Sequence, residues 1–88
     1  MKNVKIEKIN IYELEKNINR VFRNRLDKSD MNRLLKLCFT YNIGYDVLYE
    51  VVLEAEKRNK LSIPYIEGII KNLKKEGVSD MVSYILKK

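Results

Sequence analysis

The segment from Ser62 to Val78 constrains the fold of this chain most strongly, because it encodes a complete amphipathic helix with both of its ends. Ser62 can cap the first turn, Ile63-Pro64 suit that turn, and Gly77 can adopt the left-handed conformation that ends a helix. At about 100° per residue, its apolar residues fall on one face, opposite lysines and Glu67. The segment therefore predicts a helix whose packing face is Tyr65, Ile66, Ile69, Ile70 and Leu73 and whose cationic face is Lys71, Lys74 and Lys75.

Two helices are predicted before the middle of the chain. Apolar residues at helical spacing indicate a first helix over about residues 10–22, which ends among arginines that the helix dipole favours. Asp27, with Asp30 three residues later, resembles a capping box and predicts the start of a second helix that stops near Asn42. The apolar set of this second helix is Met31, Leu34, Leu35, Leu37, Cys38, Phe39 and Tyr41.

Two more helices complete the pattern. Asp46 is expected to cap a third helix that runs to about Asn59 and is apolar around most of its circumference, which predicts a central position. Ser79 or Asp80 is expected to start a short fifth helix that must dock on the others or on a partner. Its apolar residues are Met81, Val82, Tyr84, Ile85 and Leu86.

The whole chain of 88 residues suits one compact all-α domain of about five short helices. We expect the helical domain to span residues 10–88 and residues 1–9 to form an N-terminal tail, whose order is left open. The tail has neither the apolar stretch of a signal peptide nor the length of a membrane span, so a cytoplasmic protein with no membrane partner is predicted. A lone Cys38 agrees with a reducing compartment and is expected to be buried.

The positive charge is concentrated in the last third of the chain. Residues 57–88 contain eight Lys/Arg and three acidic residues, a net charge of +5, whereas residues 1–56 contain ten and nine, a net charge of +1. Such a distribution is typical of an electrostatic footprint for a polyanion, although lysines that only keep a small domain soluble would give the same count.

Catalysis is not expected from this composition. The chain has no histidine and one cysteine, which excludes the usual zinc sites and the Ser-His and Cys-His nucleophile pairs. Its three glycines are isolated, so no phosphate loop exists, and no carboxylate pair stands out. We therefore predict no enzyme activity, no catalytic residues, no metal site and no cofactor.

Several of these motifs together resemble the C-terminal DnaD-like domain of replication-initiation proteins from Gram-positive bacteria and their phages. The family's Tyr-x-x-x-Ile-x-x-x-Trp helix with its lysine-rich end is matched by Tyr65, Ile69 and Leu73 followed by residues 74–78. Upstream, residues 26–30 and 41–48 are similar to the starts of the family's second and third helices. Two departures are the leucine at the tryptophan position and Phe22-Arg23-Asn24-Arg25 in place of a Gly-Arg-Pro segment.

The resemblance implies a DnaD-like helical fold and a non-enzymatic role in replication initiation, of the primosome type. In the family, the motif helix and the segment after it are implicated in DNA binding, and related proteins help to load the replicative helicase. They usually carry an N-terminal winged-helix and oligomerisation domain, so the chain resembles either a fragment or a stand-alone version. Oligomeric state and the preference for single-stranded or duplex DNA stay open.

The predicted DNA contacts are lysines for phosphates and tyrosines for bases, with little sequence preference. Tyr45, Tyr49, Tyr65 and Tyr84 could stack on bases if exposed, although the spacing of Tyr65 favours a core position. Gly68 inside a helix suggests close approach by another helix or by a phosphate backbone, and contact with another helix is the favoured of the two. The predicted interface is Lys57, Arg58, Lys60, Tyr65, Lys71, Lys74, Lys75, Lys87 and Lys88.

Two other functions also fit the sequence. The domain could be an adaptor whose exposed apolar positions, on the last helix, dock a replication, helicase-loading or phage protein. It could also be a helical domain whose DNA activity has decayed, since leucine replaces the motif tryptophan.

Overall fold

The computed structural model describes residues 11–87, and the regular secondary structure in that range is entirely helical. The elements are α1 (Ile11–Val21), α2 (Lys28–Tyr41), α3 (Tyr45–Lys57), α4 (Ile63–Lys75) and α5 (Met81–Lys87). This confirms the predicted all-α fold of five short helices. The predicted tail, residues 1–9, lies outside the described residues.

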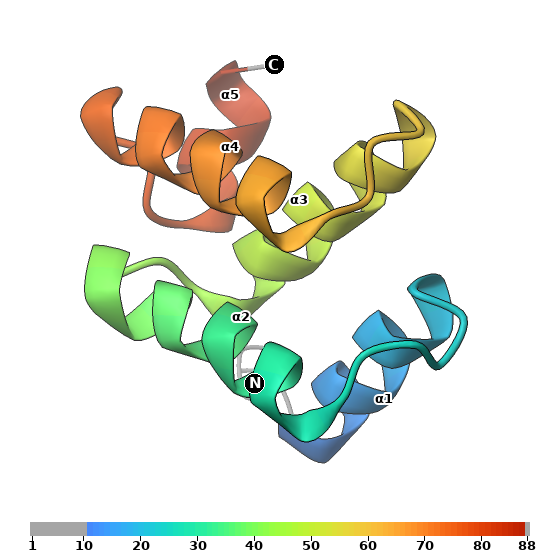
Figure 1. The fold of residues 1–88 in the computed structure, drawn as a ribbon. Coiled ribbons are helices and arrows are strands. Elements are labelled where there is room, and N and C mark those ends of the chain that lie inside the picture. The colour runs from blue at the N-terminus through green and yellow to red at the C-terminus, as the bar shows by residue number, and fades with distance from the viewer. Residues whose placement is uncertain (1–10, 88) are drawn as a thin grey trace, which may run out of the picture.

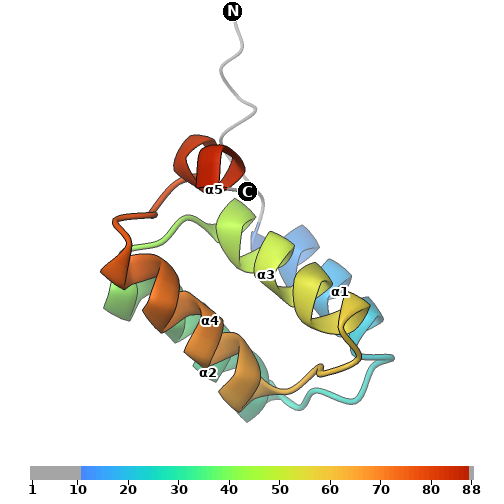
Figure 2. The same ribbon diagram turned by 90° about the horizontal axis from the view of Figure 1, so that it is seen from above.

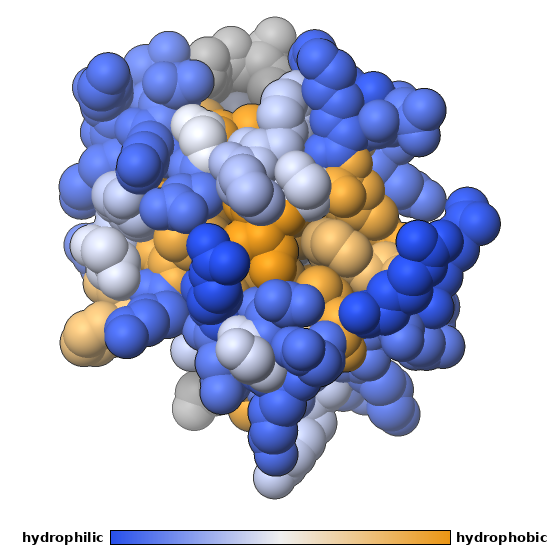
Figure 3. Space-filling view, in the orientation of Figure 1, coloured by the Kyte–Doolittle hydropathy of each residue, from blue (hydrophilic) through white to orange (hydrophobic). Residues whose placement is uncertain are grey.

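Helix α3 lies at the centre of the fold, as its apolar circumference predicted. It contacts α1, α2, α4 and α5, and α2 packs in addition against α4 (Figure 1). Apolar residues gather at the centre of the face seen in Figure 3, between α4 and α2, and hydrophilic side chains surround them. The residues of α3 without any solvent exposure are Val47, Leu48, Val51, Val52 and Ala55.

The helices are arranged as two side-by-side pairs. Helices α1 and α3 run in the same direction, and so do α2 and α4 (Figure 1, Figure 2). The α1–α2 connection, residues 22–27, therefore lies next to the α3–α4 connection, residues 58–62, at one end of the molecule (Figure 2). Residues far apart in the sequence meet at this end.

Three of the helices end in the same hydrogen-bonded motif. In α4 the N–H of Gly77 donates to the carbonyl of Lys74 at 3.0 Å, and the N–H of Val78 donates to that of Leu73 at 2.9 Å. This is a Schellman motif, which requires a left-handed residue after the helix, and Gly77 supplies it with φ 78°. The same pair of bonds ends α1 and α3, where the left-handed residues are Arg23 and Asn59.

Most of the predicted caps are confirmed. An Oδ1 atom of Asp27 accepts from the N–H of Asp30 at 2.8 Å, and Ser62 Oγ accepts from the N–H of Tyr65 at 3.3 Å. Asp80 Oδ1 accepts from the N–H of Ser83 at 2.8 Å, which lowers the pKa of the Asp80 carboxyl. Asn42, at the end of α2, is left-handed with φ 54°.

The expected capping role of Asp46 is wrong. Helix α3 begins two residues earlier than a cap at Asp46 would place it, at Tyr45 with Gly44 as the N-cap, and the Asp46 carboxylate accepts from the adjacent N–H of Val47 at 2.8 Å. Gly44 is fixed from outside the helix, because its N–H donates to the carbonyl of Ser79 at 3.1 Å. A tertiary hydrogen bond thus sets this helix start.

In α2 and α5, fewer apolar side chains are buried than the apolar patterns predict. Phe39 is 88% exposed, because α2 packs on α3 and α4 and leaves that side uncovered. In α5, Tyr84 is buried against the fold, but three other apolar side chains are exposed, namely Val82, Ile85 and Leu86. Cys38 is buried, as predicted.

Candidate nucleic-acid interface

Three lysines form a compact group on α4, which we call the α4 cluster: Lys71, Lys74 and Lys75. All three are exposed, and their spacing of three and four residues brings them onto adjacent turns. Lys71 Nζ lies 3.9 Å from Glu67 Oε2, a loose surface pair. No ion pair joins Lys74 or Lys75 to another residue among residues 11–86. The α4 cluster is therefore available to an external anion.

A second basic group follows α3. Lys57 ends that helix, and Arg58 and Lys60 lie in the α3–α4 connection, all of them exposed. Arg58 Nε donates to Glu54 Oε2 at 2.6 Å, and this hydrogen bond raises the pKa of the guanidinium. Part of the charge of Arg58 is thus already compensated within the protein.

Lys60 and Tyr65 lie together at the start of α4. Lys60 Nζ is 5.7 Å from the centroid of the Tyr65 ring, within the range of a cation–π contact. Tyr65 is half-buried, so it lies at the edge of the packing face and not inside the core. Its remaining exposed edge could contact a base.

The other tyrosines differ in exposure. Tyr45 is 37% exposed and Tyr49 is half-buried. Tyr84 is only 6% exposed because it anchors α5, so it does not meet the condition of exposure that stacking requires. The side chains of Lys87 and Lys88 lie outside the described residues.

The structure separates the predicted interface into two groups. Lys57, Arg58 and Lys60 precede α4, whereas Lys74 and Lys75 occupy its last turn. A helix of 13 residues is about 20 Å long at 1.5 Å per residue, so the two groups lie about that far apart. A ligand that contacts both groups must follow the length of α4.

Two arginines that the sequence analysis did not include lie beside the second group. Arg23 and Arg25, from the α1–α2 connection, line a cavity of about 480 Å³ together with Glu56 and Asn59. A count of charge along the chain cannot show that these arginines lie near the end of α3, because their proximity results from the parallel packing of α1 and α3. The sequence signal for these residues is the run of arginines after the first helix, for which the sequence analysis gives only a favourable interaction with the helix dipole.

A model of the replication initiation and membrane attachment family (DnaB_2) matches residues 15–85, which span α1 to α5. The chain belongs to this family. The resemblance to DnaD-like domains is thereby confirmed, and with it membership of a family of replication-initiation proteins. Neither the comparison with curated proteins nor the comparison with solved structures found a match. Within residues 11–87, no helix is both long and apolar enough to cross a membrane.

The position of the family's motif tryptophan lies inside this replication-initiation domain. Leu73 occupies it and is 4% exposed, in contact with the core formed by α2, α3 and α4. The side chain at this position therefore packs in the interior. Replacement of the tryptophan by leucine does not remove a surface group from this fold.

Gly68 is exposed on the outer side of α4, and the expected close contact with another helix is wrong. A Cβ atom built on Gly68 would meet no atom within 4 Å. Gly68 precedes Lys71 by three residues and Lys75 by seven, so it shares their face of the helix. This bare backbone lies in the middle of the exposed surface of α4.

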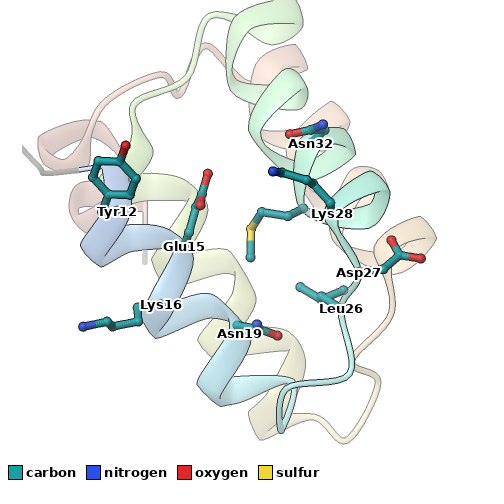
Figure 4. Close-up of a pocket in the computed structure, with 9 residues that line it drawn as sticks. Tyr12, Glu15, Lys16, Asn19, Leu26, Asp27, Lys28 and Asn32 are labelled. Atoms are coloured by element: carbon teal, nitrogen blue, oxygen red, sulfur yellow. The ribbon is translucent and has the colours of Figure 1, made fainter.

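A further cavity and a buried thiol lie outside the candidate interface. The cavity between α1 and α2, about 430 Å³, is lined by Met31 and by two carboxylates and two lysines, which are Glu15, Asp27, Lys16 and Lys28 (Figure 4). Among the described residues, no group of three His, Cys, Asp or Glu side chains could hold a metal ion. Burial raises the pKa of the Cys38 thiol to about 12, helped by the nearby charge of Asp46, so this thiol is protonated at neutral pH.

Proposed function

We propose that this replication-initiation domain is a non-enzymatic DNA-binding module with little sequence preference. The α4 cluster carries the proposal, because three exposed lysines on adjacent turns of one helix form a compact site for phosphates. A lysine ammonium neutralises a phosphate as a point charge and does not read bases. The proposal takes its biological setting from the family, whose description names replication initiation.

The proposed binding surface follows α4 from its first turn to its last. Its length of about 20 Å corresponds to about six nucleotide steps of a duplex strand at 3.4 Å per step. Tyr65 supplies an aromatic edge near one end, and Gly68 gives the strand access to the middle. The proposed contacts are Lys57, Arg58, Lys60, Tyr65, Lys71, Lys74 and Lys75, with Lys87 and Lys88 at the C-terminus.

Charge reversal on the α4 cluster tests the proposal. The triple change Lys71→Glu, Lys74→Glu and Lys75→Glu should abolish binding of labelled oligonucleotides in fluorescence anisotropy. Helical circular dichroism and melting temperature should change little, because all three side chains are exposed.

A matched control reverses three exposed lysines elsewhere in the domain, on α1 and α2. The control triple, Lys16→Glu, Lys28→Glu and Lys36→Glu, has the same net charge as the test triple. It should retain most of the binding at moderate salt. Binding that survives the α4 triple, or that falls equally in both triples, would show that the α4 cluster is not the site.

A second function, as a protein-interaction adaptor, is favoured by the exposed apolar side of α5. Val82, Ile85 and Leu86 are 67%, 60% and 79% exposed and lie on the side of the helix opposite Tyr84. Such a surface suits another protein of the replication machinery. If no oligonucleotide binds even at low salt, this function becomes the better account. Ile85→Asp with Leu86→Asp should then abolish binding of any replication protein that the parent domain captures.

A further inference from the structure

The cavity between the two connections at one end of the fold has the features of an anion site. Arg23 and Arg25 line it from the α1–α2 connection, and Glu56 and Asn59 line it from the end of α3. Both arginines are exposed, and neither forms an ion pair with another described residue. Two arginines thus line one cavity of about 480 Å³.

The charge around this cavity is strongly positive. Residues 20–25 and 54–60 together contain six Lys/Arg and two glutamates, a net charge of +4. Glu54 forms an ion pair with Arg58 and does not line the cavity. Among the described residues, Glu56 is the acidic residue of the cavity lining. The two arginines outweigh it, so the lining itself has a net charge of +1.

Arg23 also occupies a backbone position that normally favours another residue. It has φ 60° in the left-handed site of the Schellman motif that ends α1, and Asn24 after it also has φ 60°. Glycine is the usual residue at this site because a Cβ atom is disfavoured there. Arg23 thus occupies a position where glycine would be less strained, so the backbone alone does not account for an arginine here.

We infer that this cavity, bordered by Arg23 and Arg25, binds a backbone phosphate of a nucleic-acid strand. A guanidinium donates two parallel N–H groups to two phosphate oxygens, which makes arginine well suited to this ligand. Asn59 adds a side-chain amide at the edge of the cavity, and Phe22 and Leu61 supply its apolar part. The inference rests on the proposed function and extends the interface from α4 to the N-terminal third of the domain.

The salt dependence of oligonucleotide binding tests the cavity. Each neutralised phosphate contributes about 0.7 to the log-log salt slope for single strands and about 0.9 for duplex DNA. Arg23→Gln with Arg25→Gln should therefore reduce the magnitude of the slope by about 0.7 for single strands or about 0.9 for duplex DNA, the loss of one phosphate contact. The control Arg33→Gln with Lys36→Gln, on exposed positions of α2, removes the same charge and should leave the slope unchanged.

Two single variants separate binding from folding. Arg23→Gly should weaken binding while it keeps or raises the melting temperature, since glycine suits φ 60° better than arginine does. Glu56→Gln removes the carboxylate from the cavity lining and should strengthen binding. An unchanged affinity in both variants would overturn the inference.

The outcomes also distinguish this inference from the proposed function. If the arginine pair has no effect while the α4 triple abolishes binding, the cavity is not part of the interface and the α4 site stands. If the arginine pair reduces the slope and the α4 triple has no effect, the cavity stands and the α4 site fails. Inorganic phosphate should compete much more weakly than an oligonucleotide, compared per phosphate at constant ionic strength. Equal competition would show that the cavity binds small anions and would overturn the assignment to a nucleic-acid strand.

Discussion

Leu73 fills an interior position near the end of α4, where only 4% of it is exposed. Leu73→Trp therefore inserts a much larger side chain into a packed core, and the free energy of unfolding should fall by about 1–3 kcal/mol. Urea denaturation followed by circular dichroism measures the change. A variant that is as stable as the parent and binds single-stranded DNA more tightly would show that the tryptophan of the family reaches the surface at this position.

Gly68 lies in open space on an otherwise regular helix. Gly68→Ala should raise the free energy of unfolding by roughly 0.5–1 kcal/mol, because alanine loses less backbone entropy in a helix and the added Cβ meets nothing. Chemical denaturation measures this gain. Gly77→Ala is the control and should destabilise, since Gly77 is left-handed with φ 78°. A loss of stability in Gly68→Ala would contradict the open position of this residue.

Single residues were predictable from sequence where the deciding contact lies within a few positions. Ser62, Asp27 and Gly77 each act through bonds to residues three to five places away, so the pattern around them contains the information. Phe39 and Gly68 were interpreted incorrectly, because their surroundings depend on which helices pack against that side. The spacing of nearby residues does not contain the information about which helices pack there.

At the scale of elements, the five helices follow from apolar periodicity together with these local signals. Helix α3 was recognisable as central because apolar residues occupy most of its circumference. Its first residue was misplaced because Gly44 is fixed by a hydrogen bond to Ser79, far away in the sequence. The pairing of α1 with α3 and of α2 with α4 could not be derived, because an apolar face shows that a helix packs but not against which partner.

Helix α5 should be the least protected helix of the fold. It has seven residues, packs mainly on α3 and leaves most of its apolar side chains exposed. Native-state hydrogen exchange should show faster exchange for the amides of α5 than for those around Val51 and Val52. Tyr84→Ala should accelerate exchange in α5 more than in α3. Equal protection of the two helices would contradict this and would indicate that α5 belongs to the same cooperative unit.

At the scale of the whole molecule, the charge count along the sequence identified only part of the candidate interface. It correctly placed the lysines between residues 57 and 75 on the surface, because a solvated lysine needs no tertiary information to be exposed. It omitted Arg23 and Arg25, which lie beside the α3–α4 connection only because α1 and α3 pack in parallel. The exposed basic residues therefore come from the α1–α2 connection as well as from residues 57–75.

The central claim, that this replication-initiation domain binds DNA through phosphates, is tested most directly by fluorescence anisotropy across a salt series. Labelled single-stranded and duplex oligonucleotides of equal length are titrated with the domain at each salt concentration. The account predicts saturable binding to single strands with a log-log slope of about −2 or steeper, as expected for three or more phosphate contacts. Absence of binding at low salt, or an affinity that does not depend on salt, would contradict it.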